Sequence, residues 1–267
     1  MSYSPNFDMT ARNVSRPIPT RRAWTVRRKS APRPAAAPLA ARITRRFDVE
    51  WFDGTDIQDI SRVVPALPLF EEAFGAFAHG VLIQTSEGPV AIEDVLPGMM
   101  LETGEGEHVR LMWKGSINLI PGAPTLSDVP QKLYRMMPDA LGPGKPVQDQ
   151  SFGPYARRLD RDPKARALLG VEKALVPVRL LADGMSVIEV QPVAPVRIYH
   201  LQTEPHAAIL AGGVEVETYH PGPDFALSMS DEMMDVFLNF FPHLDDLPDF
   251  GRMCAARLSA DDMAAFS

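Results

Sequence analysis

The sequence predicts an all-β body, and three observations lead to this fold class. From about residue 47 onward the chain holds many short runs rich in Val, Ile and Leu, each of strand length. Turn-forming Gly and Pro separate these runs. Long helical periods do not alternate with them, which argues against a parallel α/β architecture. With 267 residues, 45% of them apolar, the chain is long enough for one large or two small domains.

The first ordered elements are expected to be a strand, a short helix and a hairpin. Residues 47–51 alternate apolar and polar side chains, as a half-buried strand does. Residues 67–77 are rich in Phe and Ala and predict a short helix. Residues 81–85 and 90–92 predict two strands joined by a tight turn, and residues 111–115 predict another strand.

The middle of the chain predicts an irregular segment followed by more strands. Residues 121–170 contain prolines at 121, 124, 130, 138, 143, 146, 154 and 163, a density that blocks long helices and central strands. Ala165–Leu169 predicts one helical turn within it. Further strands are predicted at residues 174–181, 186–190, 196–201 and 209–219, and the pair Gly212-Gly213 is a hairpin signal inside the last of them.

The C-terminal part is expected to be helical. Ser230 is a candidate N-cap, and the acidic residues Asp231 and Glu232 favour the positive end of the helix dipole. Helical spacing then relates Met233, Met234, Phe237, Leu238 and Phe241, and this stripe is expected to pack on the protein's own core rather than form an exposed docking face. Ser259, Asp261 and Asp262 predict the start of a last short helix reaching Phe266.

Charge is distributed very unevenly along the chain. Residues 1–46 hold 11 Lys or Arg and one acidic residue, Asp8, whereas the remainder holds 16 basic and 33 acidic residues. The basic segment is rich in Pro and Ala and has no amphipathic period, so we expect a disordered arm over residues 1–45. Weak anion binding by residues 11–46 is one expectation. A solvated tail that touches its own acidic body at low salt is the other, and Trp24 is the one aromatic that interleaves the basic clusters.

Several classes of protein and site are excluded by composition. A run of about 18 apolar residues is absent, so no transmembrane segment is predicted. The N-terminus has no apolar stretch after its basic residues, which argues against a cleavable signal, so cytoplasmic localisation is the default and signal-independent export stays open. The single cysteine, Cys254, excludes an intrachain disulfide and a zinc site built on several thiolates. No cofactor is expected.

Residues 76–99 carry the most informative motif. They read Ala76-Phe77-Ala78-His79-Gly80-Val81, and then Gly88-Pro89-Val90-Ala91-Ile92-Glu93-Asp94-Val95-Leu96-Pro97-Gly98-Met99. This frame resembles the opening of a Hint domain, the self-processing module of hedgehog proteins and inteins, in its bacterial form. The family opens Cys-Phe-x-x-Gly-Thr, followed by Gly-x-x-x-Val-Glu-Asp-Leu-x-x-Gly-Asp. The resemblance covers about residues 69–222 and implies a horseshoe or β-barrel of short strands.

The resemblance also shows what this chain lacks. Hint chemistry begins when a thiol attacks the carbonyl of the preceding residue, and a histidine protonates the departing amide nitrogen. Ala76 stands at the position of the thiol, so the Gly75–Ala76 bond has no route to a thioester. The histidine motif, Ser-Pro-x-His in bacterial relatives, best matches Gly153-Pro154-Tyr155-Ala156-Arg157, where Ala156 replaces the histidine.

A third sequence block matches the Hint motifs more closely than the second does. Residues 199–206 and 211–219 are similar to the family's His-Leu-x-x-x-x-His and Ala-Asn-Gly-x-x-x-Glu-Ser runs. Glu204 lies near a position where relatives often carry aspartate, and His206 matches the second histidine. Without a thiol to assist, His200 and His206 are expected to be structural hydrogen-bonding residues. A metal site built from His200, His206 and His220 is a weaker alternative because no carboxylate pattern accompanies it.

The sequence therefore predicts a degenerate Hint domain kept as a structural or interaction module, with an unknown protein partner. Its site positions are the vestigial Ala76, Ala156, Glu204 and His206, none of them confidently catalytic. The expected organisation is a basic arm (1–45), a leading strand and linker (46–68), the Hint-like domain (69–222) and a helical extension (223–267).

Two alternative functions stay open. One is an active protein that cleaves near Gly75–Ala76 with Thr85, Ser86 or Thr218 as nucleophile and His206 as acid. The other is a nucleic-acid or membrane-surface adaptor that works through the arm.

Overall fold

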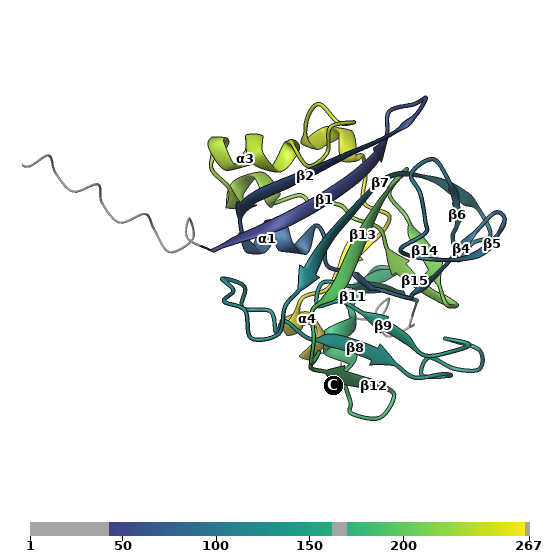
Figure 1. Ribbon diagram of the computed structural model, residues 1–267. Coiled ribbons are helices and arrows are strands. Elements are labelled where there is room, and N and C mark those ends of the chain that lie inside the picture. Colours follow the sequence, from purple (N-terminus) through teal and green to yellow (C-terminus); the bar gives the residue numbers. More distant parts are fainter. Residues whose placement is uncertain (1–42, 162–169, 265–267) are drawn as a thin grey trace, which may run out of the picture. The chain divides into compact units, whose positions relative to one another are not determined.

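The computed structural model describes residues 43–161 and 170–264, and these residues form a mainly β structure (Figure 1). The described strands belong to one large sheet that is not closed on itself. Its main path runs β12-β8-β9-β3-β13-β7-β6-β4-β14-β15-β10-β11-β16, and β1, β2 and β5 pair off this path. The all-β fold class is therefore confirmed, in an open rather than a closed form.

The N-terminal half contributes two hairpins and a long central strand. Its elements are β1 (Thr44–Phe52), β2 (Ile57–Pro65), α1 (Pro68–Glu72), β3 (Phe77–Ala78), β4 (Leu82–Thr85), β5 (Gly88–Ala91), β6 (Met100–Glu102) and β7 (His108–Leu119). The first strand begins two residues before Arg46, within the segment that we expected to be disordered; the rest of that arm lies outside the described residues. Helix α1 is shorter than the predicted 67–77, because the chain must turn at Gly75 to enter the sheet as β3.

The proline-rich segment is more regular than the sequence predicts. It contains β8 (Leu133–Met136), β9 (Gln150–Phe152) and β10 (Arg157–Asp160). Each strand is three or four residues long and fits between prolines, so the prolines bound the strands instead of interrupting their ladders. The expectation of irregular structure over 121–170 was therefore wrong at these strands, and the helical turn predicted at Ala165–Leu169 lies outside the described residues.

The third part of the chain follows the predicted strands closely. Its elements are β11 (Ala174–Pro177), the 3₁₀ helix η2 (Val178–Leu181), β12 (Val187–Val190), β13 (Val196–Glu204), β14 (Ala208–Ala211) and β15 (Val214–Glu217). The strand predicted over 174–181 ends at Pro177, which has no amide hydrogen to continue the ladder. Gly212 and Gly213 form the predicted hairpin turn, with φ of +57° and +90°.

The C-terminal part is helical where the sequence predicts it. It contains η3 (Phe225–Ser228), α3 (Asp231–Leu238), η4 (Leu247–Phe250), β16 (Ala256–Arg257) and α4 (Ala260–Ala264). The Ser230 side chain caps α3 by accepting a hydrogen bond from the Met233 amide, and Ser259 accepts one from the Asp262 amide at the start of α4. The predicted reach of this last helix to Phe266 lies outside the described residues. No helix of the described residues is long and apolar enough to cross a membrane.

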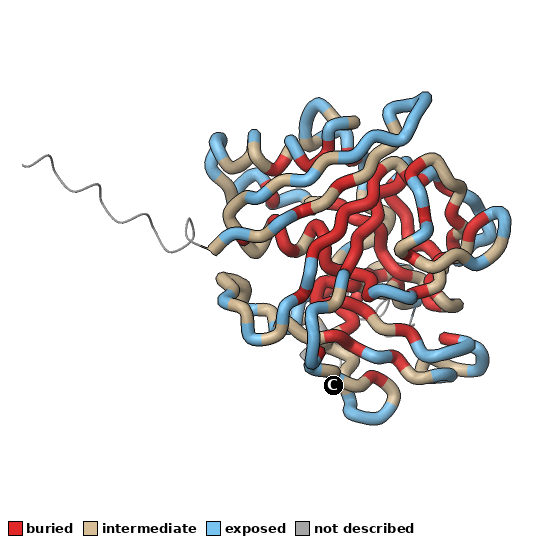
Figure 2. Tube along the Cα trace, viewed as in Figure 1, coloured by how far each residue is buried: buried red, intermediate tan, exposed pale blue. Residues whose placement is uncertain are grey.

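Two large apolar clusters make up most of the core, and buried residues concentrate along the central strands (Figure 2). One cluster fills the space among β3, β4, β7, β9, β13 and β14. The other is aromatic and joins β1 and α1 to α3, which lie near one another in Figure 1. Its fully buried rings are Phe47, Phe70, Phe74, Trp113, Phe237, Phe240 and Phe241. The apolar stripe of α3 therefore packs inward through Phe237, as expected.

Candidate functional site

The Gly75–Ala76 peptide lies in the interior, where the chain passes from α1 into the sheet. The Ala76 amide donates to the Tyr199 carbonyl on β13 at 2.9 Å. On the opposite side, the Gly75 carbonyl accepts from the Tyr155 amide at 3.1 Å, and the Ala76 carbonyl accepts from the Gly153 amide at 2.8 Å. Since β3 lies between β9 and β13, backbone hydrogen bonds hold this peptide from both sides.

The segment from Gly153 to Ala156 packs directly on this peptide. A Cβ built on Gly153 would lie 2.3 Å from the Gly75 oxygen, and one built on Gly75 would lie 2.7 Å from Cδ2 of Tyr155. Backbone atoms cannot move aside as a flexible side chain can, so Gly153 is needed for this close approach. The structure thus brings together the two segments that carry the first two Hint-like motifs.

Ala156 follows this contact, and its environment is apolar. The residue is fully buried, its amide donates to the Gly153 carbonyl, and its carbonyl accepts from the Val178 amide. Ala76 is also fully buried and belongs to the same apolar cluster. Ala76 and Ala156 therefore each contribute a methyl group to this apolar core.

Tyr155 is the ionisable side chain in contact with the Gly75–Ala76 peptide. Its hydroxyl donates to Ser127 Oγ at 2.8 Å and accepts from Gln131 Nε2 at 3.3 Å. Burial raises the pKa of Tyr155 to about 12, with the carboxylates of Glu71 and Glu72 acting in the same direction. The phenol therefore stays protonated near neutral pH and cannot act there as a base.

A chain of partly buried ion pairs, centred on the buried carboxylate of Glu217, starts at the residue after Ala156. Arg157 pairs with Glu72 at 2.6 Å and with Glu217 at 3.5 Å. Glu217 also pairs with Arg257 at 2.9 Å and faces His206 at 3.5 Å. Burial would raise the pKa of Glu217, but His206, Arg257 and Arg157 outweigh it and lower this pKa to about 2. The network joins α1, β10, β15 and β16 through two carboxylates, Glu72 and Glu217.

His206 lies at the far end of this network from Ala156. Its Nδ1 accepts a hydrogen bond from the Cys254 amide at 2.9 Å, and its Nε2 lies 3.0 Å from the Thr218 carbonyl oxygen. The two bonds together place the proton on Nε2. Burial disfavours the imidazolium, but interactions with Cys254 and Glu217 outweigh it and raise the pKa of His206. His206 therefore takes up a second proton more readily than an ordinary histidine, and the facing carboxylate of Glu217 stabilises that proton.

Glu204 is not brought to the Gly75–Ala76 peptide. It is exposed at the end of β13, five residues after Tyr199, which corresponds to roughly 16 Å along a strand. Of the four predicted site positions, the structure therefore brings Ala76 and Ala156 together, links His206 to them through ion pairs and leaves Glu204 apart.

The other histidines of the third block hydrogen-bond to the backbone. His200 Nδ1 accepts from the Leu201 amide, and His220 Nδ1 accepts from the Gly222 amide. Burial lowers the pKa of His200 to about 3 and that of His220 to about 4, so both are neutral. Within residues 43–161 and 170–264, no group of His, Cys, Asp or Glu is arranged to hold a metal ion.

The three alternative nucleophiles are each engaged or placed elsewhere. Thr85 Oγ1 donates to the Gly88 carbonyl within the β4–β5 hairpin, and Ser86 is exposed in its turn. Thr218 Oγ1 is buried between Thr203 and Ala207. The acyl shift requires the nucleophile on the residue directly after the Gly75 carbonyl, and none of the three stands at that position.

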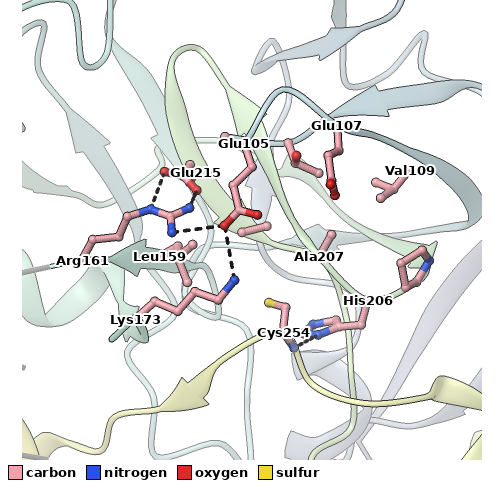
Figure 3. Close-up of a pocket in the computed structure, with 14 residues that line it drawn as sticks. Glu105, Glu107, Val109, Leu159, Arg161, Lys173, His206, Ala207, Glu215 and Cys254 are labelled. Atoms are coloured by element: carbon pink, nitrogen blue, oxygen red, sulfur yellow. Dashed lines mark hydrogen bonds and ion pairs between the residues drawn. The ribbon is translucent and has the colours of Figure 1, made fainter. Parts of the chain in front are cut away.

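A pocket of about 150 Å³ lies on the Cys254 side of His206 (Figure 3). Cys254 and Thr103, neither of which the sequence analysis placed at a site, both line this pocket. Neither position belongs to a motif, so no local signal in the sequence could have placed them beside His206.

Comparison with known protein families identifies the domain. The Hint domain family model matches residues 75–223, more than half of the chain. A comparison with curated proteins finds no match. The matched region begins at the Gly75 carbonyl and includes the Gly153–Ala156 segment and strands β13 to β15. The chain belongs to the Hint domain family.

Proposed function

We propose that this chain is a Hint domain that has lost self-cleavage and serves as a structural or interaction module. The observation that carries the proposal is the buried Gly75–Ala76 peptide, flanked by the methyl groups of Ala76 and Ala156 where the reaction needs a nucleophile and an acid. The peptide carbonyl is held by the Tyr155 amide, but nothing adjacent in the chain can attack it.

The segment before Ala76 supports the same proposal. In self-cleavage this segment would be the part released. Here Phe47, Phe70 and Phe74 belong to the aromatic cluster that also contains Trp113 and Phe240. Glu72 pairs with Arg157, and β1 pairs with β7 over residues 48–51. Releasing this segment would therefore expose a core and break a partly buried ion pair.

The adaptor alternative concerns the basic arm, nearly all of which lies outside the described residues. No specific observation in the described residues favours it. The partner, the compartment and the bacterial character of the domain stay predictions from the sequence.

Intact-mass measurement tests the proposal. The full-length chain is incubated with a strong external thiol at neutral pH, beside Ala76→Cys and Ala78→Cys. The Ala78→Cys variant places a buried thiol two residues further on and serves as the matched control. We expect the wild-type chain to stay a single species of 29.4 kDa. Wild-type fragments 1–75 and 76–267 would overturn the proposal. Cleavage confined to Ala76→Cys would support the proposal further, because restoring the thiol alone would then restore cleavage.

A further inference from the structure

Strand β2 forms an open edge of the sheet. Its nine residues pair with β1 without a break in register, and no strand of the described residues pairs with its other side (Figure 1). Exposed edge strands usually carry a lysine, a bulge or an internal proline, which prevents pairing with another chain. This strand has no lysine, and its proline, Pro65, stands at the last position. The edge is therefore accessible to a further strand.

Two hydrogen bonds of the β1–β2 hairpin show which backbone groups face the open edge. The Ala66 amide donates to the Ile43 carbonyl at 2.8 Å, and the Asp53 amide donates to the Asp56 carbonyl at 3.1 Å. Both bonds continue the register of the hairpin. Since hydrogen-bonded pairs alternate along an antiparallel ladder, the even-numbered residues of β2 bond to β1. The N–H and C=O groups that point outward are therefore those of Ile57, Asp59, Ser61 and Val63.

The outward groups are unused, and exposed apolar side chains accompany them. None of the four residues has a backbone partner on the open side within residues 43–161 and 170–264. Ile60 and Val64, on the other face of β2, pack against the aromatic cluster, whereas Ile57 and Val63 are 44% and 68% exposed. Free ladder groups beside exposed apolar side chains are the features to which an extended segment binds by strand addition.

The strand is complementary to a second copy of itself. In an antiparallel pair about a two-fold axis, opposing side chains share one face of the sheet, so the axis must pass beside a residue rather than between two residues. An axis at Ile60 places Ile57 opposite Val63, and Asp59 opposite Ser61, of the second copy. Every outward N–H group then meets an outward carbonyl. The exposed apolar side chains of each copy thus contact those of the other.

The neighbouring registers fit less well. An axis at Ser61 would place Ile57 opposite Pro65, which has no amide hydrogen to donate. An axis at Asp59 would place Val63 opposite the turn that precedes β2 and leave its backbone groups without a strand to pair with. The register centred on Ile60 is therefore favoured.

Charge also favours this register. Asp59 would lie opposite Ser61, whose hydroxyl accepts a hydrogen bond from Arg46 at 2.9 Å and donates one to Asp48. Arg46 and Arg197 both pair with Asp48, so this side of the hairpin holds one more positive than negative charge. The carboxylate of Asp59 from the second copy would face that positive charge.

We propose that two copies of this chain pair through β2 in this register and form a symmetric dimer with one continuous sheet. The same strand serves both copies, so the assembly closes at two chains. One strand pair is a small interface, and we expect a dissociation constant of about 10–100 µM. The pairing does not depend on the proposed loss of self-cleavage.

Sedimentation equilibrium of the full-length chain tests the dimer. We expect the average mass to rise from 29.4 kDa toward twice that value as the concentration increases from about 1 to 300 µM. A mass that stays at 29.4 kDa over this range would overturn the proposal. This measurement needs no variant, so it decides the question even if a variant fails to fold.

Asp59→Pro tests the backbone pairing. Proline removes an outward N–H that β1 does not use, so the hairpin should still form. In the dimer each copy loses one hydrogen bond and meets the bulk of the ring, and we expect dimerisation to weaken about tenfold or more. Asp59→Ala is the matched control, because it keeps the N–H and should weaken dimerisation less than about threefold. Equal dimerisation of the two variants would contradict pairing through the ladder.

A charge exchange tests the register. Val63→Lys and Ile57→Glu each place a charge opposite an apolar side chain of an identical copy, so each alone should dimerise more weakly than the wild type. Mixing the two in equal amounts should restore dimers, because the new lysine of one chain faces the new glutamate of the other. Mixing Val63→Lys with Val63→Glu should not, since position 63 faces position 57. Recovery in the second mixture alone, or dimerisation that neither single variant weakens, would overturn the proposal.

Discussion

The Cα of Gly153 lies against the carbonyl group of Gly75, so close that a Cβ at position 153 would fall 2.3 Å from the Gly75 oxygen. The two residues come from segments 78 positions apart in the chain, and both peptides are buried. This contact packs the Gly75–Ala76 peptide against the segment that leads to Ala156, three residues further on. It joins the chain just before β3 to the chain just after β9.

Gly153→Ala should destabilise the fold. The new methyl group meets backbone atoms of Gly75 and Ala76, and overpacking of this kind costs about 1–3 kcal/mol. Urea unfolding measures the difference. Gly104→Ala is the matched control, because its Cβ meets only the flexible Glu215 side chain and should cost less. Equal stability of Gly153→Ala and the wild type would contradict the close contact.

Glu217→Gln should be among the most damaging single changes. It removes the buried carboxylate that faces the partly buried Arg157 and Arg257, and breaking a buried pair costs about 3–5 kcal/mol. Glu189→Gln, which removes one half of the exposed pair with Lys132, should cost less than about 1 kcal/mol. Thermal unfolding of both variants separates these cases; similar melting temperatures would argue against the buried network.

Stability should fall as the pH drops below about 6.5. Burial lowers the pKa of His200 to about 3 and the pKa values of His220 and His243 to about 4, whereas all three bind protons near pH 6.5 when unfolded. Since the unfolded state binds more protons across this window, the free energy of unfolding decreases with falling pH. Each histidine contributes a slope of about 1.4 kcal/mol per pH unit in mid-window.

Urea titrations at pH 7, 6 and 5 measure this slope. His243→Gln should reduce this slope by the contribution of about one titrating proton. Leu201→Val, a core change without a titrating group, should lower stability at every pH and leave the slope unchanged. A slope that His243→Gln does not alter would mean that His243 is not buried in its neutral form.

Phe74→Ala should show that the segment before Ala76 belongs to the core. Phe74 contacts the rings of Phe47, Trp113 and Phe240 at centroid distances of 4.8 to 5.2 Å. Removing a buried Phe ring costs about 3–5 kcal/mol. Val63→Ala on β2, at a side chain that is 68% exposed, should change stability by less than about 0.5 kcal/mol. If Phe74→Ala unfolds at the same urea concentration as the wild type, the segment is not part of the core.

The sequence predicts much of this fold because local signals agree with it. The Gly212-Gly213 pair predicts the β14–β15 hairpin, and Ser230 predicts the start of α3. Strands β8 and β9 escaped prediction because three or four residues between prolines carry too little periodicity. They form since long-range partners, such as Phe77 opposite Phe152, complete their ladders.

The candidate site could be predicted in part. The motif frame places Ala76 and Ala156 on one site, and the structure brings their segments together. The motif frame does not reveal that Glu217 gathers Arg157, Arg257 and His206, because these residues lie up to 100 positions apart. The roles of these residues depend on how deeply each is buried. The alternation of apolar and acidic residues in Val214-Glu215-Val216-Glu217 does not show that Glu217 is buried while Glu215 is more exposed.

Hydroxylamine treatment of the wild-type chain tests whether self-cleavage has been lost, because hydroxylamine traps an ester or thioester whichever side chain forms it. The chain contains no Asn-Gly bond, the peptide that hydroxylamine ordinarily cuts, so the background is low. After prolonged incubation at neutral pH, we expect one intact species of 29.4 kDa. A fragment ending at Gly75 as a hydroxamate would contradict it and identify the chain as an active self-processing domain.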